Sequence, residues 1–190
     1  HIAKAVAGVL SAMDGPKQRP APERCLGSQT VQPPILSIRN GVNLHQIVQT
    51  ADSFLFVSEF IGGARIVRLS SQRSPAAITS WLGDSIGRWE DDVLVVETRG
   101  FNGFTRLDTV GHPHSDALHL TQTFRRIDRS RMAYTVTIDD PKTYTRTWTN
   151  ERTCRLHDGP LLEYSCEENN KSLWDGRIKT WTPPWAQPGQ

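Results

Sequence analysis

Residues 118–138, LHLTQTFRRIDRSRMAYTVTI, decide the expected fold. Apolar and polar residues alternate in both halves of this stretch, and a period of two is typical of a β-strand with one buried face. The polar residues 128–130 separate the halves, and so short a separator joins antiparallel strands. The stretch therefore predicts a β-hairpin whose inward face carries Gln122 and Tyr134.

Strand-like segments continue on both sides of this hairpin. They are short, rich in β-branched and aromatic residues, and separated by Gly, Asp, Ser and Pro; they span 45–50, 54–60, 64–69, 92–98, 143–156 and 161–166. Gly83 to Gly87 predict a tight turn that aims Trp89 inward. About eight antiparallel strands lose their exposed edges best by closing. We therefore predict one closed, mostly β, antiparallel β-barrel, lipocalin-like in shape, over residues 23–173, with a β-sandwich as the alternative.

Both ends of the chain differ from this region. Apolar residues recur at helical spacing within residues 1–13, which predicts a short amphipathic helix ahead of a Pro-rich lead-in that reaches residue 22. Residues 174–190 contain Trp and Pro without periodicity and predict an irregular C-terminal extension. We expect residues 1–13 and 174–190 to be the surfaces that contact a protein partner.

Charge and hydropathy exclude two classes of partner. Twenty-two Lys and Arg against 20 Asp and Glu give a net charge of +2, which lacks the basic excess of a nucleic-acid-binding protein. No apolar run approaches the roughly 20 residues that a membrane-spanning helix needs. We therefore expect no nucleic acid and no transmembrane segment.

The densest polar cluster lies just before the hairpin. In an extended chain His112, His114 and Asp116 share one face, as an acid–base pair or a metal site requires. Since the spacing lacks a third well-placed ligand, we expect no metal and no other cofactor. His114 is the candidate acid or base, Asp116 its orienting group, and Arg125 or Arg146 the group that stabilises an anion. The alternative is a loop whose side chains cap backbone groups.

Several other polar and aromatic residues are expected to point into the barrel. An interior with carboxylate, amide and guanidinium groups is too polar for a dry core, because buried polar groups need partners. It indicates either a hydrogen-bond network or a ligand site. The candidate ligand-binding residues are Trp89, Glu97, His112, Gln122, Tyr134, Tyr144 and Trp148.

Two functional hypotheses from different classes follow. One is a small-ligand-binding or accessory protein, acting as a carrier or as a subunit of a larger assembly. The other is a cofactor-free acid–base enzyme, such as a lyase, isomerase or cyclase, acting on a small molecule inside the barrel. Binding ranks ahead because no complete catalytic constellation is readable. A loss of turnover in His114→Ala would favour the enzyme.

The three cysteines, Cys25, Cys154 and Cys166, form no CxxC motif. One disulfide with one odd thiol is an option, as are three buried free thiols. A bond between Cys25 and Cys166 would tether the Pro-rich segment, and chain-entropy models assign closure of so long a loop roughly 4–5 kcal/mol.

Three motifs carry a resemblance to known proteins: WLGDSIGRWE with LVVET within residues 81–98, GHPHSDAL at 111–118, and EYSCEENN at 163–170. In this order they resemble a large group of bacterial proteins, many of them exported, over roughly residues 23–173. The resemblance implies an extracytoplasmic (periplasmic or secreted) location and favours the Cys25–Cys166 disulfide. Gln122 stands where the group has glutamate, which weighs against acid–base chemistry at that position. The resemblance implies no particular activity.

Overall fold

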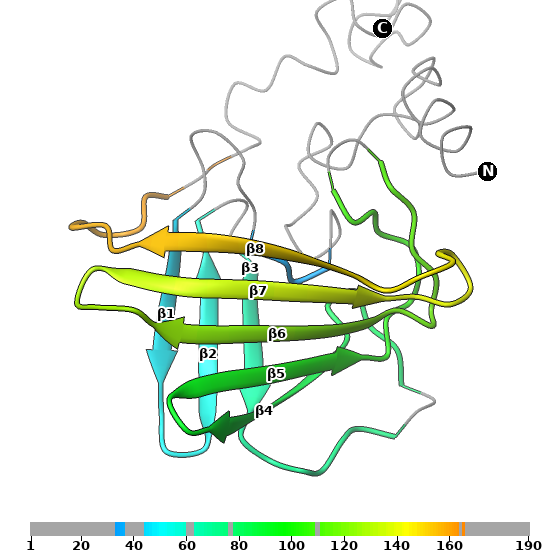
Figure 1. The fold of residues 1–190 in the computed structure, drawn as a ribbon, viewed down its shortest axis with the longest axis horizontal. Helices are drawn as coiled ribbons and strands as arrows, with labels where there is room; N and C mark the ends of the chain where they lie inside the picture. The colour runs from blue at the N-terminus through cyan, green and yellow to red at the C-terminus, as the bar shows by residue number, and fades with distance from the viewer. Residues whose placement is uncertain are drawn as a thin grey trace, which may run out of the picture.

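The computed structural model describes residues 33–36, 44–59, 63–75, 78–108, 111–163 and 165. This part of the chain forms eight β-strands in a single sheet, in which the strands follow one another in chain order (Figure 1). The strands are β1 (His45–Gln49), β2 (Ser53–Ser58), β3 (Gly63–Arg68), β4 (Asp84–Glu90), β5 (Val93–Arg99), β6 (His119–Arg126), β7 (Arg131–Asp139) and β8 (Trp148–Arg155).

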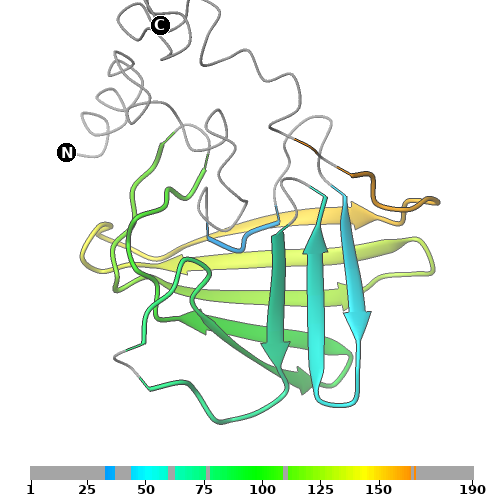
Figure 2. The same ribbon diagram turned by 180° about the vertical axis from the view of Figure 1, so that it is seen from behind.

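The sheet folds over on itself between β3 and β4. All other neighbouring strands are antiparallel, but β3 and β4 are parallel and meet at one residue pair, Arg68 with Ile86. Beyond this seam β1–β3 run crosswise behind β4–β8 (Figures 1 and 2). Gly87 permits the close approach, since a Cβ there would lie 3.0 Å from Cγ1 of Val67. The result is an open, strongly curled sheet, or half-barrel.

The hydrophobic core fills the space between these two layers. Phe56 of β2 lies 5.2 Å from Phe124 of β6, and Phe124 lies 5.1 Å from Tyr134 of β7, measured between ring centroids. Phe54 meets the ring of Trp89 edge-on at 5.8 Å. Aromatic pairs at such distances add to the stabilisation from apolar burial. These contacts join the layers that the backbone connects at only one seam.

The predicted closed barrel is wrong. The edges of the sheet are β1 and β8, which do not pair with each other among the described residues. They run crosswise, so their backbones cannot form a ladder (Figure 1). Since the described strands form one continuous sheet, the alternative of two separate sheets also fails. Residues 33–36, which we call the strap, lie beside β8: Arg152 of β8 donates a hydrogen bond from Nη1 to the carbonyl of Leu36.

Individual strands depart from expectation at two places. The predicted turn at Gly83–Gly87 instead contributes most of β4, and residues 161–163 form no strand.

The predicted N-terminal helix and C-terminal extension lie outside the described residues, as do Cys25 and Cys166. Cys154, on β8, has a free and half-buried thiol, and burial raises its pKa.

Phe124 tests the importance of the interlayer contacts. It is 6% exposed, so Phe124→Ala removes a buried ring from both aromatic contacts and leaves a cavity. We expect the free energy of unfolding to fall by about 3–5 kcal/mol. Ile66→Ala is the control, because Ile66 is 64% exposed, and we expect a change within about 0.5 kcal/mol. Urea denaturation measures both values; a similar small loss in both variants would contradict this account of the core.

Candidate functional site

A buried cation lies where the two layers meet. Arg65 of β3 is only 7% exposed, and its pairing with Phe56 in the β2–β3 ladder turns it inward. Its Nε donates to Oγ of Ser85 at 3.0 Å, and its Nη2 donates to Oγ1 of Thr98 at 2.8 Å. The guanidinium carbon also lies 5.7 Å from the centre of the Phe56 ring. Residues of β2, β3, β4 and β5 therefore surround one guanidinium group.

The guanidinium has no carboxylate partner in the described part of the chain. Its third hydrogen bond runs from Nη1 to the carbonyl of Pro34 in the strap, at 3.2 Å. Burial lowers the pKa of Arg65 to about 10, so the side chain still carries its charge at neutral pH. An unpaired buried charge is costly, since neutral acceptors compensate only part of its lost hydration.

Gln122 and Tyr134 extend this polar cluster. Both are fully buried, and Nε2 of Gln122 donates to the Pro34 carbonyl at 2.9 Å and to the Tyr134 hydroxyl at 2.7 Å. Because a carbonyl only accepts, the amide nitrogen must face Pro34, which fixes the orientation of the amide. Its oxygen, Oε1, then has no hydrogen-bond partner among the described residues. Burial raises the pKa of Tyr134, which stays protonated at neutral pH.

The strap supplies hydrogen-bond partners to several of these buried polar groups. The Pro34 carbonyl accepts from both Arg65 and Gln122, and the Leu36 carbonyl accepts from Arg152. The Leu36 amide in turn donates to the Tyr134 hydroxyl at 3.3 Å. Figure 2 shows this segment in blue between the start of β3 and strand β8. Two strap carbonyls thus serve as acceptors for three donor side chains of the concave face.

Sequence reasoning placed two of these residues in the site and missed the others. Gln122 and Tyr134 were predicted as inward-facing ligand-binding residues, and both contribute to the cluster. Arg65, Arg152 and Pro34 were not predicted. Alternation gave no correct signal for Arg65, because its apolar neighbours Ala64 and Ile66 are the exposed residues and Arg65 is the buried one. Only the register of the β2–β3 pair shows that Arg65 lies opposite Phe56.

The predicted acid–base group is arranged differently. His114 is 5% exposed, its Nδ1 lies 2.9 Å from the carbonyl of Ser115, and its Nε2 lies 2.5 Å from Oγ1 of Thr105. Since the carbonyl only accepts, Nδ1 carries the proton and Nε2 accepts from the Thr105 hydroxyl. Asp116 is exposed and pairs with Lys142 at 2.7 Å. The contacts of His114 therefore tie it to its own loop.

The remaining members of that prediction do not converge on His114. His112 pairs with Asp108, at 2.6 Å between Nδ1 and Oδ2, rather than with His114. Arg125 lies exposed on the outer face of β6, and Arg146 is exposed in the loop before β8. In the described part of the chain no three His, Cys, Asp or Glu side chains gather in the arrangement that holds a metal ion.

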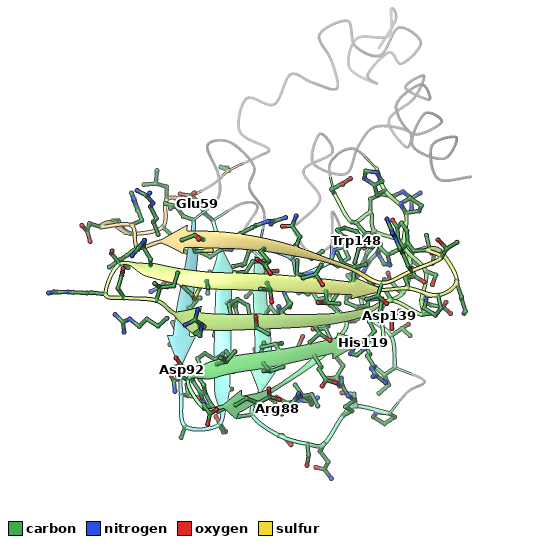
Figure 3. The ribbon with its side chains drawn as sticks, in the orientation of Figure 1. Glu59, Arg88, Asp92, His119, Asp139 and Trp148 are labelled. Carbon is green, nitrogen blue, oxygen red and sulfur yellow. The ribbon has the colours of Figure 1, made fainter. Side chains whose placement is uncertain are left out.

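Glu97 lies on the outer face of β5, so its predicted inward orientation is wrong. Leu94 and Val96 point inward instead, and Glu97 pairs with Arg88 at 2.7 Å and with Arg73 at 3.1 Å. Figure 3 labels Arg88 on this outer side, which faces the viewer. The hydrogen bond from Arg88 lowers the pKa of Glu97, so the carboxylate remains ionised. Glu97 thus belongs to a surface ion-pair network.

Tyr144, Trp148 and Trp89 lie at the margins of the half-barrel. The Tyr144 hydroxyl donates to the carbonyl of Pro113 at 2.7 Å, and its ring meets Trp148 edge-on at 6.3 Å. Trp148 is 39% exposed, and Trp89, at the opposite side beside Phe54, is 48% exposed. Of these three residues, Trp89 is therefore the one that contacts Phe54, which lies on β2 two residues before Phe56, the ring that contacts Arg65.

In comparisons with protein families, curated proteins and solved structures, no match to the chain was found. Among the described residues, no helix combines the length and the apolar character that crossing a membrane requires.

The buried histidine predicts a pH dependence of stability. Burial lowers the pKa of His114 below its ordinary value of 6.5, so the unfolded chain takes up the proton first as the pH falls. The free energy of unfolding should therefore decline below about pH 6.5, by at most about 1.4 kcal/mol per pH unit for one proton. Burial shifts His45 and His119 in the same direction. We expect His114→Asn to reduce the slope between pH 7 and pH 5.

Urea denaturation at several pH values measures this slope. His157→Asn is the matched control, because it removes one imidazole at an exposed position after β8. An unchanged slope in His114→Asn would mean that His114 is not held neutral by its surroundings.

Proposed function

We propose that the protein binds a small molecule with a carboxylate group on the concave face of the half-barrel. The observation that carries the proposal is Arg65, a charged guanidinium that is 7% exposed and has only neutral acceptors among the described residues. A carboxylate accepts two parallel N–H bonds from a guanidinium and also neutralises it. A bound carboxylate would supply the negative charge that the described surroundings of Arg65 lack.

The strap supports the proposal, because its carbonyls stand where the acceptors of a ligand would lie. Arg65 and Gln122 both donate to one oxygen, that of Pro34. Binding requires the strap to move, so that a carboxylate replaces the Pro34 carbonyl. A carboxylate favours this exchange because, unlike the Pro34 carbonyl, it carries the opposite charge to the guanidinium and accepts two parallel N–H bonds from it.

Gln122 supports a second feature of the ligand. Its Oε1 is buried without a partner in the part of the chain that the structure describes, so it accepts a hydrogen bond from any donor brought beside it. Since Gln122 and Arg65 contact the same Pro34 oxygen, a donor a few bonds from the carboxylate reaches it. The buried rings of Phe56 and Phe124 lie in contact with each other in the core next to this site, so they would have to part to admit the apolar or aromatic body of the ligand.

The remaining parts of the proposal rest on the sequence. The resemblance to exported bacterial proteins supports an extracytoplasmic location, and residues 1–13 and 174–190 are the proposed contacts of a protein partner. The contacts of His114 do not support the alternative of an acid–base enzyme. Both of its ring nitrogens are engaged within the loop, and Thr105, its hydroxyl partner, is itself 1% exposed.

Equilibrium binding by titration calorimetry tests the proposal with three probes: phenylpropanoate, its neutral analogue phenylpropanamide, and phenyllactate, which adds a hydroxyl donor beside the carboxylate. We expect phenylpropanoate to bind at least about tenfold more tightly than the amide, because only the acid neutralises the guanidinium and accepts two parallel N–H bonds from it. We expect phenyllactate to bind more tightly still, and Gln122→Leu to remove that additional gain.

Arg65→Met should weaken phenylpropanoate binding at least about tenfold while the variant stays folded. Arg125→Met is the matched control, since Arg125 is exposed on the outer face, and it should bind as the wild type does. Equal affinity for the acid and the amide, equal binding by Arg65→Met, or no binding by the wild-type protein would each contradict the proposal.

A further inference from the structure

Strand β1 forms an open edge of the sheet. It pairs with β2 on one side, and no described strand pairs with it on the other. Ile47 and Val48 are 38% and 39% exposed. An exposed edge strand offers unpaired N–H and C=O groups to another strand.

The hydrogen bonds at both ends of β1 identify which backbone groups β2 leaves unused. The Thr50 amide donates to the Ser53 carbonyl at 2.9 Å, and the Glu59 amide donates to the Leu44 carbonyl at 3.0 Å. In an antiparallel pair, residues bonded to the neighbour alternate with residues whose N–H and C=O point away. The odd-numbered residues of β1 therefore point to the open edge, namely His45, Ile47 and Gln49.

The two edges of the sheet differ in charge. Strand β8 contains Glu151, Arg152 and Arg155, and charges on an edge oppose pairing with a further strand. Strand β1, HQIVQ, contains no Asp, Glu, Lys or Arg. Of these two edge strands, β1 therefore lacks the charged side chains that would oppose pairing with another strand.

We propose that β1 pairs antiparallel with β1 of a second copy of this chain, about a twofold axis at Ile47. In this register Ile47 faces Ile47 of the second copy, and His45 faces Gln49. On the concave side the aliphatic side chains of Ile47 meet at the centre and the polar side chains of His45 and Gln49 meet at the ends. On the other side Gln46 faces Val48, and no like charges oppose in any pair. Ile47 lies opposite Phe56 on the concave side, so the second Ile47 extends the core across the edge.

The size of the contact sets its strength. A five-residue edge buries less than the roughly 1,000 Å² expected of a stable interface, so the dimer forms reversibly and depends on concentration. This inference is independent of the proposed ligand site, since it uses a different surface.

Sedimentation velocity of the full chain over a wide concentration range tests the pairing. We expect the wild type to shift from monomer to dimer as the concentration rises. Ile47→Lys places two ammonium groups together at the axis, and Ile47→Pro removes an outward N–H that β2 does not use; both should stay monomeric. Ile66→Lys is the matched control, because it makes the same change at an exposed position away from the edge, and it should dimerise.

Amide hydrogen exchange of the wild type tests the same point without a variant. The amides of His45, Ile47 and Gln49 should exchange rapidly in dilute protein and more slowly in concentrated protein. A wild type that stays monomeric, or an Ile47→Lys variant that dimerises, would overturn the inference. So would protection of these amides that does not change with concentration, since another segment of the same chain would then cover the edge.

Discussion

The burial of the Arg65 guanidinium is the constraint that orders the concave face and the strap. Its three hydrogen bonds reach Ser85 of β4, Thr98 of β5 and Pro34 of the strap, and so connect segments far apart in the sequence. Because β3 and β4 meet at a single residue pair, these bonds and the aromatic contacts fix how the two layers of the sheet face each other. The position of the strap follows from the same group.

The open shape of the sheet follows from how the strap and β8 are arranged. A closed barrel would need β1 to run beside β8, but the two cross, and the strap bonds to Arg152 near that gap. The polar interior is thereby covered by a short segment rather than by a strand ladder. A segment held through a few side-chain hydrogen bonds is easier to displace than a paired strand, because fewer contacts must break. Because the sheet is open and covered here by the strap, the proposed ligand can replace the strap without breaking a strand ladder.

The sequence predicted what depends on local alternation and missed what depends on tertiary partners. Gln122 and Tyr134 were assigned to the inward face because polar and apolar residues alternate cleanly in β6 and β7. Glu97 was misassigned because VLVV is aliphatic on both faces, so alternation does not identify the inner one. His114 was interpreted as a free acid or base, since its partner Thr105 comes from another part of the loop. The start of strand β4 was taken for a turn because Gly87, which permits close packing, and Gly83, which precedes the strand, are also typical of turns.

The central claim is that Arg65 is a carboxylate receptor which the strap covers in the absence of ligand. The most direct test is a crystal structure of the full chain bound to phenylpropanoate. The account predicts a carboxylate oxygen within about 2.7–3.2 Å of the Arg65 guanidinium, with the Pro34 carbonyl displaced from it. A structure in which Pro34 keeps its hydrogen bond to Arg65 while the probe binds elsewhere would contradict the claim.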